Sequence, residues 1–313
     1  MQQNFSSLLQ LTEYFKDEQT CLKYIENQRW GDKRTCPRCG CEKTYALKDG
    51  VRFKCSNKEC FKIFTAKVGS IFESSAVPLK KWFIAIYLLT SHKKGVSSHQ
   101  LARDINVTQK TAWFMLHRIR YSLSNGTFEM LGEDKAVEID ETYVGGKNSN
   151  RHLNKRVANS QGRSCKDKTP VLGMIEREGG KLVAQVVKNT RGKEIHPIIL
   201  STIKPNASIM TDEWKPYKAL SRVFAHSFVK HGEGQYVLGN VHTNSIEGFW
   251  SHLKRSIFGI YHSTSAIHLQ RYVDESVFRY NTRKIGEGER VAMMIGLADC
   301  RLKYNTLIGR RDG

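Results

Sequence analysis

Five of the eight cysteines lie between positions 36 and 60, and this cluster constrains the fold more than any other feature of the sequence. Cys36-Pro-Arg-Cys39-Gly40 is typical of a thiolate knuckle, in which two cysteines bind one metal ion and the glycine permits a tight turn. Cys55 and Cys60 supply a second pair. Four sulfurs at this spacing predict a tetrahedral, structural Zn²⁺ site with no open position for a catalytic water.

Cys41 is a weaker candidate ligand because it follows Cys39 so closely, and the isolated cysteines are expected to be ordinary thiols. The chain begins without a basic segment followed by an apolar stretch, so no secretory signal is predicted. We therefore expect a cytoplasmic protein with reduced thiols. No membrane span is expected either, because the longest apolar run, Trp82–Leu89, is far below the roughly 20 residues required.

The chain is strongly basic. Its 313 residues contain 50 Lys and Arg against 30 Asp and Glu, a formal net charge of +20. Such a field attracts polyanions, and the usual use is binding nucleic acid with release of phosphate counterions, although ribosomal and membrane-surface proteins are also basic. A hydrophobic fraction of 40% indicates a folded protein of two or three small domains.

Helical periodicity is expected over residues 5–27 and again from Pro78. Residues 98–120 then predict two short helices, with Ser98 and Thr108 as N-caps and a tight connection at Asn106 and Val107. This is the outline of a DNA-binding helix-turn-helix; a plain helical hairpin packed on the core is the alternative. The side chains expected to contact DNA are Gln109 and Lys110 at base edges and Arg118 and Arg120 at phosphates.

Alternating apolar residues between about 135 and 211 predict four strands, and helices return after about residue 240, which gives an α/β class. A basic insertion, residues 145–170, interrupts the strands. We expect it to become ordered on a polyanion, with a merely solvated loop as the alternative. Its basic residues are Lys147, Arg151, Lys155, Arg156, Arg163, Lys166 and Lys168.

Three carboxylates have the placement of a metal site. Asp140 and Asp212 each end an apolar strand pattern, and Glu247 lies on the following helix. Lys254 stands seven positions after Glu247, two helical turns on, and so shares its face. Such oxygens would hold two Mg²⁺ or Mn²⁺ ions about 4 Å apart that activate an attacking hydroxyl and a leaving oxygen, while Lys254 would bind a phosphate. In isolation each acid is more often a surface charge.

Several motifs resemble one family. The segments EIDETYVGGK, TDEW, HTNSIEGFWSHLKRSIFGIYH and YVDESVFRYNTR, with the CPRCG knuckle, resemble the ISXO-type bacterial insertion-sequence transposases (insertion-sequence family 1595). The resemblance implies an RNase H-like fold with a DDE-type active site whose first two acids are Asp140 and Asp212. Members of the family use asparagine or glutamate as the third ligand. We favour Glu247 over Asn244 because an anionic oxygen suits Mg²⁺ better.

We therefore expect a DNA transposase that cuts element ends and joins them to target DNA. Its partners would be double-stranded DNA, both terminal inverted repeats and target, and further copies of itself, at least as a dimer, in the nucleoid of a bacterium. Two alternatives are a catalytically silent, transposase-derived DNA-binding regulator and an RNase H-like nuclease without strand transfer. The expected domains are helix plus zinc ribbon (1–72), helix-turn-helix region (73–130), catalytic domain (131–285) and C-terminal tail (286–313).

Overall fold

The computed structural model describes residues 5–124, 130–133, 135–146, 148–158, 160, 164–229, 231–233, 237, 239 and 241–309. The chain divides into two compact units. The first comprises residues 1–126 and 284–313, and the second comprises residues 127–283. None of the described helices is long and apolar enough to cross a membrane.

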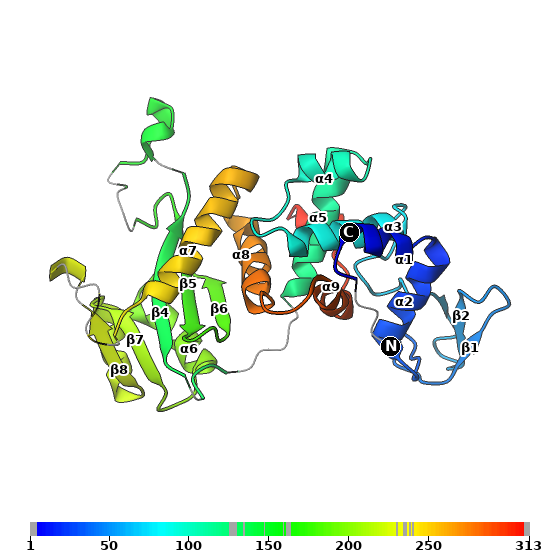
Figure 1. The fold of residues 1–313 in the computed structure, drawn as a ribbon, viewed down its shortest axis with the longest axis horizontal. Helices are drawn as coiled ribbons and strands as arrows, with labels where there is room; N and C mark the ends of the chain where they lie inside the picture. Colours follow the sequence, from blue (N-terminus) through cyan, green and yellow to red (C-terminus); the bar gives the residue numbers. More distant parts are fainter. Residues whose placement is uncertain are drawn as a thin grey trace. The chain divides into compact units, whose positions relative to one another are not determined.

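The first unit is mainly helical (Figure 1). Its apolar helix α3 contacts α1, α2, α5 and α9. The segment expected as a C-terminal tail forms two of the helices of this unit, and Arg290 of α9 donates to the carbonyl of Thr90 at 3.1 Å. The helices are α1 Leu8–Tyr14, α2 Glu18–Trp30, α3 Leu79–Ser91, α4 Ser98–Asp104, α5 Gln109–Leu123, α9 Glu287–Gly296 and α10 Tyr304–Leu307.

Two N-caps explain where these helices differ from expectation. The Asp17 carboxylate accepts from the backbone N–H of Thr20, so a new helix starts there and residues 5–27 form two helices rather than one. Ser97, not Ser98, caps α4. Thr108 caps α5 as predicted, and Asn106 adopts a positive φ of 48° in the tight turn between α4 and α5.

The first unit also contains a small antiparallel sheet, made of β1 Thr44–Ala46, β2 Phe53–Cys55 and β3 Ile63–Phe64. Its buried side is a minimal core of Phe53, Phe64, Cys36 and Cys55. The guanidinium of Arg34 lies 3.7 Å from the centre of the Phe53 ring. A core this small needs an additional cross-link to remain folded.

The second unit is built on a five-stranded mixed sheet in the order β6-β5-β4-β7-β8. Strands β4, β5 and β6 pair antiparallel, whereas β4, β7 and β8 pair parallel. The four predicted strands are present, and β8 is an additional edge strand. The strands are β4 Val137–Val144, β5 Thr169–Glu176, β6 Leu182–Val186, β7 Ser208–Asp212 and β8 Ala225–Val229.

Helices cover both faces of this sheet (Figure 1). On one face, α6 Gly192–Thr202 and the 3₁₀ helix Lys215–Arg222 pack on Val137 and Ile139. On the other, α7 Asn244–Ser256 and α8 Ala266–Asn281 pack on a second apolar cluster. Because successive residues of a strand point to opposite faces, Glu138 and Asp140 of β4 face α7.

Candidate active site and zinc site

The four predicted zinc ligands lie together. The sulfurs of Cys36, Cys39, Cys55 and Cys60 are all within 4.8 Å of one another. The Cys36–Cys60 separation is 3.8 Å and the Cys39–Cys55 separation is 3.5 Å. Tetrahedral Zn–S bonds of 2.3 Å place sulfurs about 3.8 Å apart, so the cluster fits one Zn²⁺ ion.

The knuckle at Cys36 and Cys39 forms the tight turn that the glycine after it predicted. Gly40 adopts a φ of 72° and its N–H donates to the carbonyl of Cys36 at 2.9 Å. The thiol of Cys41 instead lies 3.6 Å from the hydroxyl of Ser56, outside the four-sulfur cluster. The fifth cysteine is therefore not a member of the site.

Asp140 and Asp212 meet because their strands are neighbours. In the parallel pair, Val137 lies opposite Ile209, and the same register places Asp140 level with Asp212. Both line a cavity of about 360 Å³ at the carboxyl end of β7, together with Glu247 and Lys254 of α7. The four predicted catalytic side chains thus surround one cavity.

Hydrogen bonds hold the three acids in place. Trp250 Nε1 donates to Asp140 Oδ2 at 3.0 Å, the N–H of Trp214 donates to Asp212 Oδ1 at 3.0 Å, and Thr243 Oγ1 donates to Glu247 Oε1 at 3.1 Å. Among the described residues, only the four cysteines bring three or more metal-binding atoms within 4.8 Å of one another. The oxygens of the three carboxylates therefore lie farther apart than the ligands of a single ion would.

Two further residues of the cavity were not assigned a role from the sequence. Glu141 lines it and is only 7% exposed. Its Oε2 accepts a hydrogen bond of 2.6 Å from the buried hydroxyl of Tyr217. Burial, together with the negative charges of Glu141 and Asp212, raises the pKa of Asp140 to about 7. Trp250 also lines the cavity, and its indole covers Asp140.

Asn244, the other candidate for the third ligand, is exposed at the start of α7 and is not part of the cavity wall. Glu247, one turn later, is part of it.

The residues predicted to contact DNA separate into two groups. Gln109 and Lys110 are exposed at the start of α5, and Gln109 Nε2 donates to Ser98 Oγ at 2.8 Å. Arg118 and Arg120 are buried, with exposures of 4% and 1%. The helix turns both arginines into the core of the first unit, where Arg118 donates to the carbonyl of Glu73 at 2.7 Å. We therefore remove them from the predicted DNA contacts.

The basic insertion projects from the ends of β4 and β5 (Figure 1). Lys155 and Arg156 are exposed, and Arg151 is half-buried. Arg156 Nη2 donates to the carbonyl of Ser149 at 2.8 Å, so part of the loop is held by its own side chains. Two other basic residues of the insertion, Lys147 and Arg163, lie outside the described residues.

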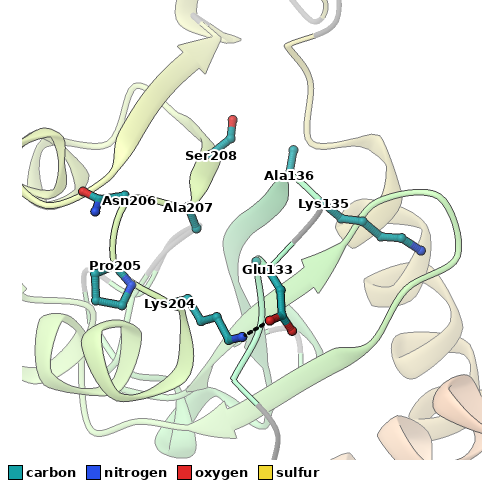
Figure 2. Close-up of a pocket in the computed structure, with 9 residues that line it drawn as sticks. Glu133, Lys135, Ala136, Lys204, Pro205, Asn206, Ala207 and Ser208 are labelled. Atoms are coloured by element: carbon teal, nitrogen blue, oxygen red, sulfur yellow. Dashed lines mark ion pairs between the residues drawn. The ribbon is translucent and has the colours of Figure 1, made fainter.

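A larger cavity, of about 490 Å³, lies at the opposite ends of β4 and β7 (Figure 2). Glu133 lines this cavity and forms an ion pair with Lys204 at 2.7 Å. Lys135 also lines it. Among the described residues of its wall, Glu133 is the only carboxylate, whereas the cavity at the carboxyl end of β7 has several, so chemistry rather than size distinguishes the candidate site.

Comparisons with known proteins match both the zinc ribbon and the domain that contains the carboxylate cavity. The family model of the ISXO2-like transposase domain matches residues 130–281, and that of the transposase zinc-ribbon domain matches residues 16–62. An uncharacterized protein in transposable element ISH50 of Halobacterium salinarum is 29% identical over 252 residues, covering 77% of this chain and 83% of its own. An uncharacterized transposase-like protein of Haemophilus influenzae is 27% identical over 106 residues, covering 34% and 85%.

The first match contains all of the five-stranded sheet with α7 and α8, and the second contains the four clustered cysteines. The chain therefore matches a transposase zinc ribbon followed by an ISXO2-like transposase domain, which confirms the resemblance to the transposases of insertion-sequence family 1595 that its motifs indicated.

Proposed function

We propose that this chain is a DNA transposase that cuts the ends of a mobile element and transfers the freed strand to target DNA, using Asp140, Asp212 and Glu247. The observation that carries the proposal is that these acids, separated by up to 107 positions, line one cavity together with Lys254. The mixed sheet with helices on both faces supports the RNase H-like fold that the family resemblance implies.

The donor set fits divalent cations. Carboxylate oxygens are the ligands that Mg²⁺ and Mn²⁺ prefer, and the three proposed ligands are among the carboxylates that line this cavity. Two ions held there would activate the attacking hydroxyl and stabilise the leaving oxygen of a phosphodiester. Glu247 rather than Asn244 is the proposed third ligand, because only Glu247 is part of the cavity wall.

The other side chains of the cavity orient the reactants. The indole of Trp250 orients the Asp140 carboxylate by donating a hydrogen bond to Oδ2. Lys254 presents an ammonium group that would bind a phosphate of the strand to be cut. No protein nucleophile is required, because a water and later a 3′-hydroxyl attack the phosphorus.

DNA would be held by exposed basic and polar residues of both units. In the first unit, Gln109 and Lys110 lie at the start of the second helix of the proposed helix-turn-helix. In the second, Arg151, Lys155 and Arg156 extend from the insertion. Phosphate contacts of this kind position DNA, while only a few side chains specify its sequence. Because two ends must be joined to one target, we propose at least a dimer, acting on DNA in the cytoplasm.

The proposal is tested with the purified zinc-loaded chain and a duplex made from the DNA that flanks its gene. In Mg²⁺ or Mn²⁺, we expect strand cleavage and, with target DNA added, joined products. The Asp140→Asn variant should lose both activities while its affinity for the duplex stays unchanged, since DNA binding depends on the basic surface. Cleavage without joined products would indicate a nuclease, and binding without cleavage would indicate a DNA-binding regulator.

A further inference from the structure

A third acid of β4, Glu138, has a role that its position in the sequence did not suggest. Its side chain is fully buried. Oε2 accepts hydrogen bonds from the backbone N–H groups of Ser245 at 2.8 Å and Ile246 at 3.0 Å, and Oε1 accepts one from the hydroxyl of Ser245 at 3.0 Å. The carboxylate therefore binds the first turn of α7 from the neighbouring strand.

This contact replaces an ordinary helix cap. The first N–H groups of a helix have no partner within the helix, and a side chain at the N-cap usually accepts from them. Thr243, the N-cap of α7, makes no such bond; its hydroxyl donates to Glu247 instead. A negative charge at this end of the helix also interacts favourably with the helix dipole.

A cation balances the buried charge. Arg177 Nε donates to Glu138 Oε1 at 2.8 Å, and Arg177 Nη2 donates to the carbonyl of His242 at 2.7 Å. His242 Nδ1 lies 3.3 Å from the same Glu138 oxygen. Arg177 thus connects Glu138 of β4 to the segment that leads into α7. Glu138 itself binds the first residues of the helix.

The attachment fixes the register of the proposed catalytic residues. Glu138 and Asp140 are two positions apart in β4 and so point to the same face of the sheet. Glu138 accepts hydrogen bonds from the first turn of α7, and Trp250, further along the same helix, donates one to Asp140. Glu247 lies between these two contacts, on the helix that they hold against the strand.

We propose that Glu138 is a positioning residue: by capping α7 from β4, it sets the distance of Glu247 and Lys254 from Asp140 and Asp212, and hence the affinity of the cavity for divalent cations. The inference rests on the function proposed above. The residue does not line the cavity itself and touches neither metal nor DNA in this account.

The test is Mn²⁺ binding by calorimetry to the full zinc-loaded chain, comparing wild type with Glu138→Gln. The amide keeps one acceptor oxygen and would place its N–H₂ group against either Arg177 or the helix N–H groups, so one of the two contacts and the negative charge are lost at nearly unchanged volume. We expect the Kd for Mn²⁺ at the carboxylate cavity to rise at least about tenfold, the range found for residues that orient metal ligands. Hydrogen exchange at the amides of Ser245 and Ile246 should also become faster.

Glu176→Gln is the matched control. Glu176 stands on the adjacent strand β5 and also accepts backbone hydrogen bonds, from Gly132 at 3.0 Å and Lys181 at 3.0 Å, but these partners lie far from α7 in the chain. The Glu176→Gln variant should bind Mn²⁺ with the same Kd as the wild type. All measurements are made below the unfolding transitions of the three proteins, because a purely structural role would lower Tm and leave the Kd unchanged.

An unchanged Kd in folded Glu138→Gln would overturn the inference. If that variant does not fold, Ser245→Ala removes only the hydroxyl contact and should raise the Kd about threefold, the effect of one hydrogen bond; a wild-type Kd there would overturn it equally. Wild-type chain that binds no Mn²⁺ at the cavity would instead refute the proposed function, so the two failures are distinguishable.

Discussion

Gly173 shows how a single missing side chain shapes the candidate site. It lies on β5 directly opposite Asp140. A Cβ atom there would come within 2.6 Å of the ring of Trp250 and 2.9 Å of Ile246 Cδ1. Glycine at this position therefore provides the space that lets the indole reach the Asp140 carboxylate.

The Gly173→Ala variant should displace Trp250 and, with it, part of α7. We expect the free energy of unfolding to fall by about 1 to 3 kcal/mol, as for other overpacked cores, and strand cleavage to fall with it. Chemical denaturation measures the first effect. Gly248→Ala, at an exposed position of α7, is the control, because nothing lies within 4 Å of a Cβ built there and alanine favours helix. Equal stability of Gly173→Ala and wild type would contradict the packing account.

Asp274 on α8 supplies a pH-dependent prediction. Burial raises its pKa to about 6 from 3.8, against the opposing effects of a hydrogen bond from Gln270 and the charge of Arg271. The folded state therefore binds this proton more tightly than the unfolded state, so stability is lost as pH rises from about 4 to about 6.

Asp274→Asn lacks this titration and can still accept from Gln270. It should be more stable than wild type at pH 7, by up to about 3 kcal/mol for a shift of two units, with the difference vanishing toward pH 4. Urea unfolding at several pH values checks this. A difference that grows as the pH is lowered would have the wrong sign.

At the residue scale, the sequence predicted those site residues whose place follows from a local pattern. Asp212 ends β7 as predicted, and Glu247 and Lys254 share a helix face. The prediction that Asp140 ends a strand is wrong, because β4 continues to Val144, but Asp140 still lines the cavity beside Asp212. Tertiary contacts decided the rest. Whether Glu138 faces a helix end, or whether Arg118 points into a core, depends on which elements pack together, and periodicity within one element carries no such information.

At the scale of elements, metal ligation matters most in the ribbon, whose sheet has only a few buried side chains. Cys36→Ser should release zinc and unfold the ribbon, because the free energy of zinc binding is part of the free energy of folding of the ribbon. Cys41→Ser should keep one zinc per chain, since that thiol is outside the cluster. Metal analysis of the two purified variants tests both; zinc loss from Cys41→Ser alone would reverse the ligand assignment.

Helix α5 allows a prediction on DNA binding. Lys110 is exposed at its start, so Lys110→Ala should weaken binding to DNA and lower the slope of log K against log salt by about 0.9, one phosphate contact. Lys23→Ala removes the same charge from exposed α2 and serves as control. Anisotropy titrations at several salt concentrations measure both. Identical slopes for the two variants would remove α5 from the proposed DNA surface.

Elements with strong periodicity or clear caps were the predictable ones. The four predicted strands, β4 to β7, and helices α7 and α8 have such patterns, and all are present. Edge strand β8, residues Ala225–Val229, is mostly half-buried or exposed and so lacks a clean alternation. The break between α1 and α2 depends on one capping bond at Asp17, which competes with an apolar pattern that continues across it.

At the scale of the whole molecule, the chain combines a small metal-stabilised sheet, a helical region and a mixed α/β domain under a net charge of +20. A positive charge of this size attracts polyanions such as DNA without selecting a sequence. The acids of the cavity lie close together despite this net positive charge. A cavity with four carboxylates in so basic a chain is most simply explained by a cation bound beside a phosphate backbone.

The most direct test of this account is anomalous diffraction from crystals of the chain grown with Mn²⁺. We predict manganese density between Asp140, Asp212 and Glu247, and its loss in Asp212→Asn crystals. Manganese-saturated wild-type crystals without density in that cavity, or with Asn244 in place of Glu247 at the ion, would contradict it.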